Sequence, residues 1–282
     1  MRQLLPLFLL LSFAVVCSSC APKIYLPERA NAPMLREAGD VKLTSSLKIQ
    51  NNSNAPKTVL SPSLDFAVSP VTGLGLIASY RKTNRYADED EDYDNTYGSQ
   101  DSVRYEGSRW EFGAGYYMPF GGKGLFEIYG GGAVGSMDRR NLEKGPDIIG
   151  NYNSKYYQIF LQPSIGFYAK EVFDMCGGVK FNIHKYSSFT SDNIGFRREF
   201  TDPRVDIEDP TFVLVGPFMN LNVGYKYAKF NMQFGANFNV GKPRLRIETP
   251  FYMSMGITLE LSPRFWRGDA QDNGDRRGPR YY

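Results

Sequence analysis

Residues 110–130 read WEFGAGYYMPFGGKGLFEIYG, and this stretch decides the fold. Apolar or aromatic side chains occupy every second position on both sides of a glycine-rich centre at 120–124. A period of two is that of a β-strand with two different faces, and a short glycine-containing connection joins antiparallel strands. The stretch therefore predicts a hairpin with one apolar face and one polar face.

The same alternation extends from this hairpin toward both ends of the chain. Ten runs share it: 41–49, 60–68, 74–80, 110–118, 126–134, 157–167, 177–183, 213–223, 230–238 and 251–261. We therefore predict an all-β fold, an antiparallel up-and-down transmembrane β-barrel of about ten strands, in a domain spanning 41–262. A soluble β-sandwich would show the same period with its apolar face turned inward, so it stays an alternative.

The lengths of the connections favour the barrel. Short turns are predicted at 69–73, 120–124, 170–174 and 226–229, and long loops at 83–102, 137–154 and 187–210. Outer-membrane barrels have short periplasmic turns and longer outer loops. Three prolines oppose the prediction, because proline cannot donate to a strand ladder and a closed barrel has no edge. We expect a bulge, a shifted register or a sheet edge at Pro62, Pro163 and Pro217.

The N-terminus has the features of an export signal. Arg2 precedes an apolar run over 4–16, which is too short to span a bilayer and has the length of a signal-peptide core. Small residues at 18–19 then precede Cys20, which resembles the lipobox of bacterial lipoproteins. The resemblance implies a signal peptide over 1–19 and acylation of Cys20, with palmitate among the acyl chains. Ordinary cleavage after Ala21 is the alternative.

The residues after Cys20 resemble the opening of a known but uncharacterised group of proteins. Residues 31–35 read NAPML and residues 37–40 read EAGD. This resembles uncharacterised outer-membrane β-barrel lipoproteins of Gram-negative bacteria, small barrels of the OmpA/OmpX kind. The resemblance implies that 20–40 is a lipid-anchored linker. An even strand count puts both chain ends on the periplasmic side of the outer membrane, with 263–282 as a disordered periplasmic tail.

No catalytic, cofactor-binding or metal site emerges, so Cys20 is the one predicted site residue. His184 is the only histidine, which excludes a multi-histidine metal site. Ser187 follows it closely, but no spacing of acid, base and nucleophile can be established, and we predict no enzyme. Cys176 is interpreted as a small apolar strand residue, because no basic neighbour in the sequence lowers its pKa.

Two sequence motifs that resemble binding sites are explained without a ligand. The acidic run 88–94 would repel itself and stay solvated, and an EF-hand fails because Tyr93 stands where glycine is required. Gly130, Gly132 and Gly135 spell G-x-G-x-x-G, but no helix is predicted after them, so they are strand glycines.

Charge and hydropathy exclude several classes of function. The net charge of +3, from 33 basic and 30 acidic residues, gives no reason to expect nucleic acid as a partner. The mean hydropathy of −0.38 excludes a bundle of membrane helices. Charges of both signs on the polar face are expected to pair and plug the lumen. They are Lys42, Asp65, Arg81, Arg109, Glu111, Glu127, Lys180 and Glu260.

These observations predict a non-enzymatic outer-membrane β-barrel lipoprotein with a structural or surface-interaction role carried by its outer loops. A small transport or ligand-binding barrel and a periplasmic β-sandwich lipoprotein are the alternatives. No cofactor is expected. Outer-membrane lipid is the expected partner, with lipopolysaccharide as a candidate and no protein partner specified.

Overall fold

The protein is described by a computed structural model. The described residues are 23–25, 28–52, 55–90, 100–141, 152–169, 171–191, 211–240, 246–247 and 251–265. Among them no helix is long and apolar enough to cross a membrane.

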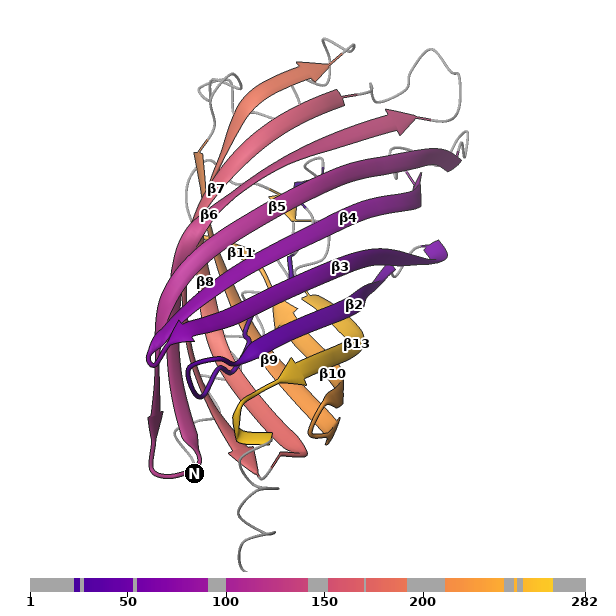
Figure 1. The fold of residues 1–282 in the computed structure, drawn as a ribbon. Helices are drawn as coiled ribbons and strands as arrows, with labels where there is room; N and C mark the ends of the chain where they lie inside the picture. Colours follow the sequence, from indigo (N-terminus) through magenta and orange to yellow (C-terminus); the bar gives the residue numbers. More distant parts are fainter. Residues whose placement is uncertain are drawn as a thin grey trace, which may run out of the picture.

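A single antiparallel sheet closes on itself to form the wall of the molecule (Figure 1). Its strands follow chain order, and the last pairs with the first through the register Met253↔Ile49 to Leu261↔Val41. They are β2 (Val41–Asn52), β3 (Ala55–Val71), β4 (Leu74–Asp90), β5 (Gln100–Phe120), β6 (Gly124–Asn141), β7 (Tyr152–Ala169), β8 (Phe173–Ser191), β9 (Thr211–Tyr225), β10 (Ala228–Ala236) and β13 (Phe251–Leu261). The fold is thus the predicted ten-stranded up-and-down barrel.

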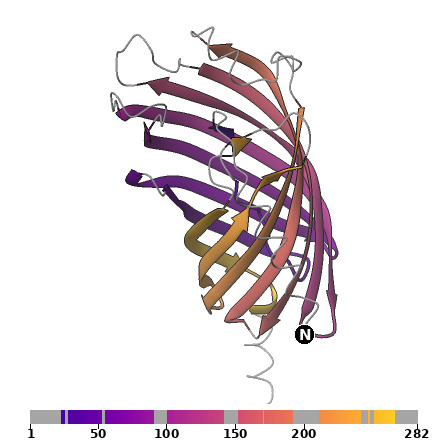
Figure 2. The same ribbon diagram turned by 180° about the vertical axis from the view of Figure 1, so that it is seen from behind.

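Three short strands complete the described structure. β11 (Phe238–Asn239) continues β10 along β9. β1 (Lys23–Tyr25) and β12 (Arg246–Ile247) form a separate parallel pair. Figure 2 shows this pair within the outline of the barrel.

The two faces of the wall are inverted relative to a soluble protein. On β5, Trp110 and Phe112 are 49% and 58% exposed, whereas the alternate residues Arg109 and Glu111 are 3% and 1% exposed. The same pattern recurs on β7 and β9, where large apolar side chains face outward and polar ones are buried. A single closed sheet with an apolar exterior and a polar interior is inconsistent with the β-sandwich alternative.

The strands at the long-loop end extend further than predicted. β4 and β5 stay in register out to Asp90↔Gln100, so residues 83–90 and 100–102 of the predicted loop are strand. Parts of the predicted loops 137–154 and 187–210 are strand as well, namely 137–141 in β6, 152–154 in β7 and 187–191 in β8. The prediction was wrong here because these strand ends lie beyond the apolar band and carry polar residues on both faces.

The prolines fit into the closed wall by interrupting the ladder on one side only. Each keeps its partner on one neighbouring strand and has none on the other. Around Pro163 and Pro217 the interrupted ladder resumes in the same register, whereas the β3–β4 ladder starts only after Pro62, at Ser63↔Arg81. The pairs kept are Pro62↔Leu47, Pro163↔Ile128 and Pro217↔Val179. Pro163 and Pro217 needed neither a sheet edge nor a shifted register, since proline lacks one donor and loses one ladder bond. Pro62 lies where β3 stops pairing with β4, so the predicted sheet edge is found there.

Residues 28–40, called the plug hereafter, lie inside the barrel. Met34 and Leu35 are fully buried and share a cluster with the lumen residues Tyr117, Leu125 and Tyr129. The segment that the sequence presents as a linker therefore forms part of the interior.

Candidate functional site in the lumen

A buried charge cluster lies in the lumen toward the short turns. The Lys229 ammonium contacts Asp174 Oδ2 at 2.6 Å and Glu260 Oε2 at 2.8 Å. Lys42 Nζ lies 3.5 Å from Glu260 Oε1, and the Asn222 amide donates to Asp174 Oδ1 at 2.5 Å. Lys42, Lys229, Asp174 and Glu260 are called the inner charge cluster, and their charges sum to zero. Buried side chains remain ionised only when their charges nearly balance.

The short-turn end is closed by contacts between the two ends of the described chain. Arg264 follows the last strand, and its guanidinium donates to both Asp40 carboxylate oxygens at 2.9 Å. It also donates to Glu171 at 3.1 Å and contacts Glu260. Burial would lower the pKa of Arg264, but the carboxylates of Glu260 and Asp40 outweigh it and raise that pKa above its usual range. This arginine therefore stays charged and ties the plug to β13.

The backbone of the plug binds a carboxylate of the wall. The N–H groups of Met34 and Leu35 donate to the two oxygens of Glu127 at 3.3 and 3.1 Å. Met34 has a φ of 58°, which is a left-handed conformation. This conformation lets the N–H groups of Met34 and Leu35 point toward the same Glu127 carboxylate. Successive N–H groups arranged in this way form a concave anion site, which here is filled by Glu127 itself.

Higher in the lumen, amide side chains from opposite walls hold the plug. Gln233 of β10 accepts from Ala30 N at 3.0 Å and donates to Ala30 O at 2.9 Å, as a neighbouring strand would. Gln162 of β7 donates to Asn31 O at 2.7 Å, and the Asn31 amide donates to Ser79 Oγ of β4 at 3.1 Å. The plug is thus hydrogen-bonded across the full width of the barrel.

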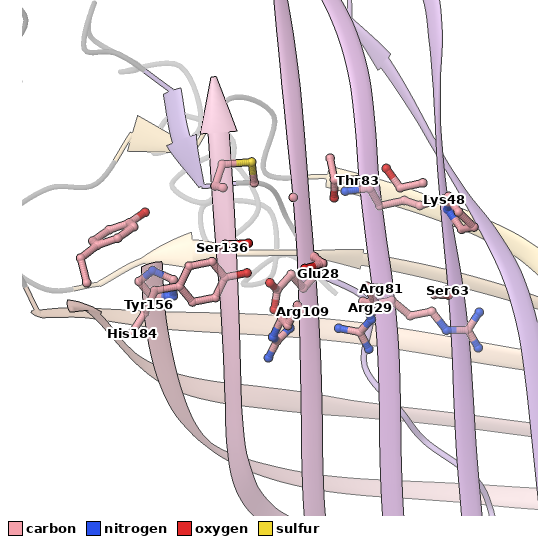
Figure 3. Close-up of a pocket in the computed structure, with 16 residues that line it drawn as sticks. Glu28, Arg29, Lys48, Ser63, Arg81, Thr83, Arg109, Ser136, Tyr156 and His184 are labelled. Atoms are coloured by element: carbon pink, nitrogen blue, oxygen red, sulfur yellow. The ribbon is translucent and has the colours of Figure 1, made fainter. Parts of the chain in front are cut away.

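Above this level a pocket faces the long-loop end of the barrel (Figure 3). It holds about 50 Å³ of space accessible to water. Its charged lining, called the outer pocket cluster, consists of one carboxylate and four basic side chains: Glu28, Arg29, Lys48, Arg81 and Arg109. Figure 3 shows the arginines and Glu28 gathered around one space, with Arg81 and Arg109 on the neighbouring strands β4 and β5 and the other two on the plug.

Ion pairs connect the outer pocket cluster to deeper carboxylates. The Asp65 carboxylate forms ion pairs with Arg29 Nε at 3.0 Å and with the Arg81 guanidinium at 3.6 Å. Glu111 lies 2.5 Å from Arg109 and 2.6 Å from Lys180 Nζ. Arg109 also contacts Glu28, so the first described residue of the plug is tied to the wall. The predicted pairing of lumen charges is confirmed for these residues.

His184 lies in the wall of the outer pocket among aromatic rings. Its ring centroid is 4.5 Å from that of Tyr156 and 4.7 Å from that of Tyr186. Ser187, the serine considered beside it, is exposed, and its hydroxyl donates to Lys155 O at 3.3 Å. These two side chains thus engage different surroundings.

The remaining candidates are placed as follows. Cys176 is buried beside the plug, in one cluster with Met34 and Leu35. The glycine motif lies within β6, and Gly135 accommodates the Tyr156 ring, which a Cβ there would meet at 2.5 Å. The described residues contain no group of acidic, histidine or cysteine side chains able to hold a metal ion. Cys20 and the side chains of the acidic run 88–94 lie outside the described residues.

Sequence reasoning missed the plug. Its residues are few and show no strand alternation, and its wall partners Gln162 and Gln233 are far from it in the sequence. The apolar pair Met34–Leu35 after Pro33 was the available signal of a buried segment, because solvated linkers are poor in large apolar residues.

No protein family model and no curated protein matches this chain. Among solved structures, it is similar to the translocator domain of the autotransporter NalP from Neisseria meningitidis, with 7% identity and a TM-score of 0.48 over 80% of this chain and 88% of that chain. It is also similar to Ail of Yersinia pestis, with 7% identity and a TM-score of 0.33 over 80% of this chain and 100% of that chain. The outer-membrane protein OprG of Pseudomonas aeruginosa is 12% identical, with a TM-score of 0.31 over 80% of this chain and 97% of that chain.

These solved structures are outer-membrane β-barrels. At such low identity and TM-scores, the architecture of this chain rests on its own strand register rather than on the likeness.

Proposed function

We propose that the chain is a non-enzymatic outer-membrane β-barrel lipoprotein, anchored through Cys20, whose outer loops carry a structural or surface-interaction role. The single observation behind this proposal is the filled lumen. The plug and two sets of paired charges occupy the interior along its axis. A barrel of about ten strands has little interior to spare, so such a filling makes it a closed scaffold rather than a channel.

The apolar exterior supports a membrane location. Wall positions such as Phe112, Ile159 and Ile257 expose more than half of their side chains on the outside of the barrel. Exposed apolar surface on this scale is unfavourable in water and is covered by lipid in membrane barrels. Outer-membrane lipid is therefore the first partner, and lipopolysaccharide is the candidate contact of the long-loop end.

The surroundings of His184 support a non-enzymatic role. Packing between two tyrosine rings is typical of a structural position, and the hydroxyl of Ser187 is engaged with backbone. A general base needs the proton it abstracts within hydrogen-bond reach.

Conductance tests the closed scaffold. Protein extracted in detergent from outer membranes should migrate differently on gels before and after boiling, and should give no stable current steps in planar bilayers. The matched variant Glu127→Ala, which removes the acceptor of two plug N–H groups, should show transient openings. Steady ohmic conductance by the unaltered protein would refute the closed scaffold.

The outer pocket favours a second candidate function, the binding of a small anion. Its four basic side chains exceed in number the three carboxylates that lie in or directly below it, Glu28, Asp65 and Glu111, and its volume suits a few waters or one small oxyanion. Isothermal titration with inorganic phosphate at low salt is the test, with Arg81→Gln expected to abolish the heat that the unaltered protein gives. Absence of heat from the unaltered protein would dismiss this candidate.

A further inference from the structure

The plug rises through the lumen from the short-turn end to the long-loop end. Asp40 contacts Arg264, just beyond the last strand. Leu35 reaches Glu127, near the start of β6, and Ala30 reaches Gln233, midway along β10. Glu28 contacts Arg109, in the half of β5 that is farther from its turn. Reading backward from Asp40, each contact lies closer to the long-loop end.

The described residues before Glu28, 23–25, lie toward the same end of the barrel. β1 pairs with β12 through Lys23↔Arg246 and Tyr25↔Ile247. β12 belongs to the connection between β11 and β13, on the long-loop side of the barrel. The N-terminal described residues are therefore joined to an outer connection.

The closed wall leaves the chain two exits, one at each end. The short-turn exit is occupied by the plug, by the inner charge cluster and by Arg264. Cys20 and Glu28 are eight chain steps apart, which span at most about 29 Å when fully extended. A return to the short-turn end would have to use lumen space that residues 30–40 already fill.

We infer that the mature N-terminus leaves the barrel at its long-loop end, so that Cys20 lies on the cell-surface side of the outer membrane. The described C-terminal residues stay at the opposite, short-turn end, where Arg264 binds Asp40. This inference rests on the proposed outer-membrane location, and it replaces the expectation that both chain ends are periplasmic. An acyl group on Cys20 would then enter the outer leaflet, whose lipids face the cell exterior.

Epitope accessibility in intact cells tests the exit. The epitope is inserted after Ala21 in the full chain, with matched insertions between Gly121 and Gly122 at a short turn and between residues 145 and 146 in an outer connection. We expect antibody to bind the Ala21 and 145 insertions equally in intact and permeabilised cells, and the short-turn insertion only after permeabilisation. An Ala21 epitope reached only after permeabilisation, with the 145 epitope reached in intact cells, overturns the inference alone.

If the 145 epitope also needs permeabilisation, the proposed orientation in the membrane fails, and the inference fails with it. Heat-modifiable migration verifies that each variant is folded. For a variant that does not fold, single cysteines replace the epitopes, at Lys23, Lys123 and Ser188, and are labelled with a membrane-impermeant maleimide. Cys176 is buried and gives a low background. Labelling at Lys23 and Ser188 but not at Lys123 supports the surface exit, and labelling at Ser188 alone overturns it.

Discussion

Replacing Lys229 by methionine should destabilise the barrel more than any substitution on its outer face. The Lys229 ammonium is fully buried and bridges Asp174 and Glu260 at 2.6 and 2.8 Å. Methionine keeps the length of the side chain but removes the charge. Two buried carboxylates then lose their shared counter-charge, in a place where water cannot replace it.

The expected loss follows from the surroundings of the two carboxylates. Removing one partner of a buried ion pair costs about 3–5 kcal/mol. Part of this cost is recovered, because both carboxylates keep other partners. Lys42 and Arg264 remain beside Glu260, and Arg36 at 3.7 Å and the Asn222 amide remain beside Asp174. We expect a decrease of about 3 kcal/mol in the free energy of unfolding, more than roughly a hundredfold in the equilibrium.

Urea unfolding in lipid vesicles measures this loss, followed by tryptophan fluorescence because Trp110 lies on the lipid-facing side. The exposed Lys82→Met is the matched control and should change the free energy by less than about 0.5 kcal/mol. Adding Glu260→Gln to Lys229→Met should restore part of the stability, since it returns the inner charge cluster to zero net charge. A loss below about 1 kcal/mol for Lys229→Met would refute the reasoning.

Three further predictions concern the interior. Gly235→Ala should lower the temperature of heat-modified migration, because the new Cβ would stand 2.4 Å from the Tyr252 ring; an unchanged temperature would contradict the close packing. Glu127→Ala should speed proteolysis of the plug in the folded barrel, since two charge-assisted hydrogen bonds worth about 1.5–3 kcal/mol each are lost, with Glu127→Gln intermediate. His184→Ala should leave the lipid composition of the outer membrane unchanged, and an altered composition would indicate catalysis.

The wall of the barrel could be predicted from the sequence because lipid imposes a regular pattern. Residues such as Phe112 and Ile159 must be apolar, and Glu111 and Gln158 behind them need not be, so alternation marks each strand. The pattern fades where the wall leaves the bilayer. The strand ends near Asp90 were therefore missed, although their ladder bonds continue.

The sequence predicted that the interior contains paired charges, but not which residues pair with one another. Charges of both signs on one face indicate pairing, and pairs such as Lys180 with Glu111 confirm it. Lys229 was not among the charges selected, because its place between Asp174 and Glu260 depends on which strands close the ring. The contact of Ala30 with Gln233 joins positions too far apart in sequence for any local pattern to indicate it.

The plug also bears on how the gene should be expressed. Because the strand pattern starts at Val41, an expressed protein designed from the sequence alone would begin there. Such a chain would keep its wall, but Asp65, Glu127 and Gln233 would lose the partners that residues 29–35 now supply. Water and ions would enter to solvate them. A recombinant protein trimmed to its strands would then behave as a leaky pore, and its conductance would be a product of the truncation and no test of the closed scaffold proposed above.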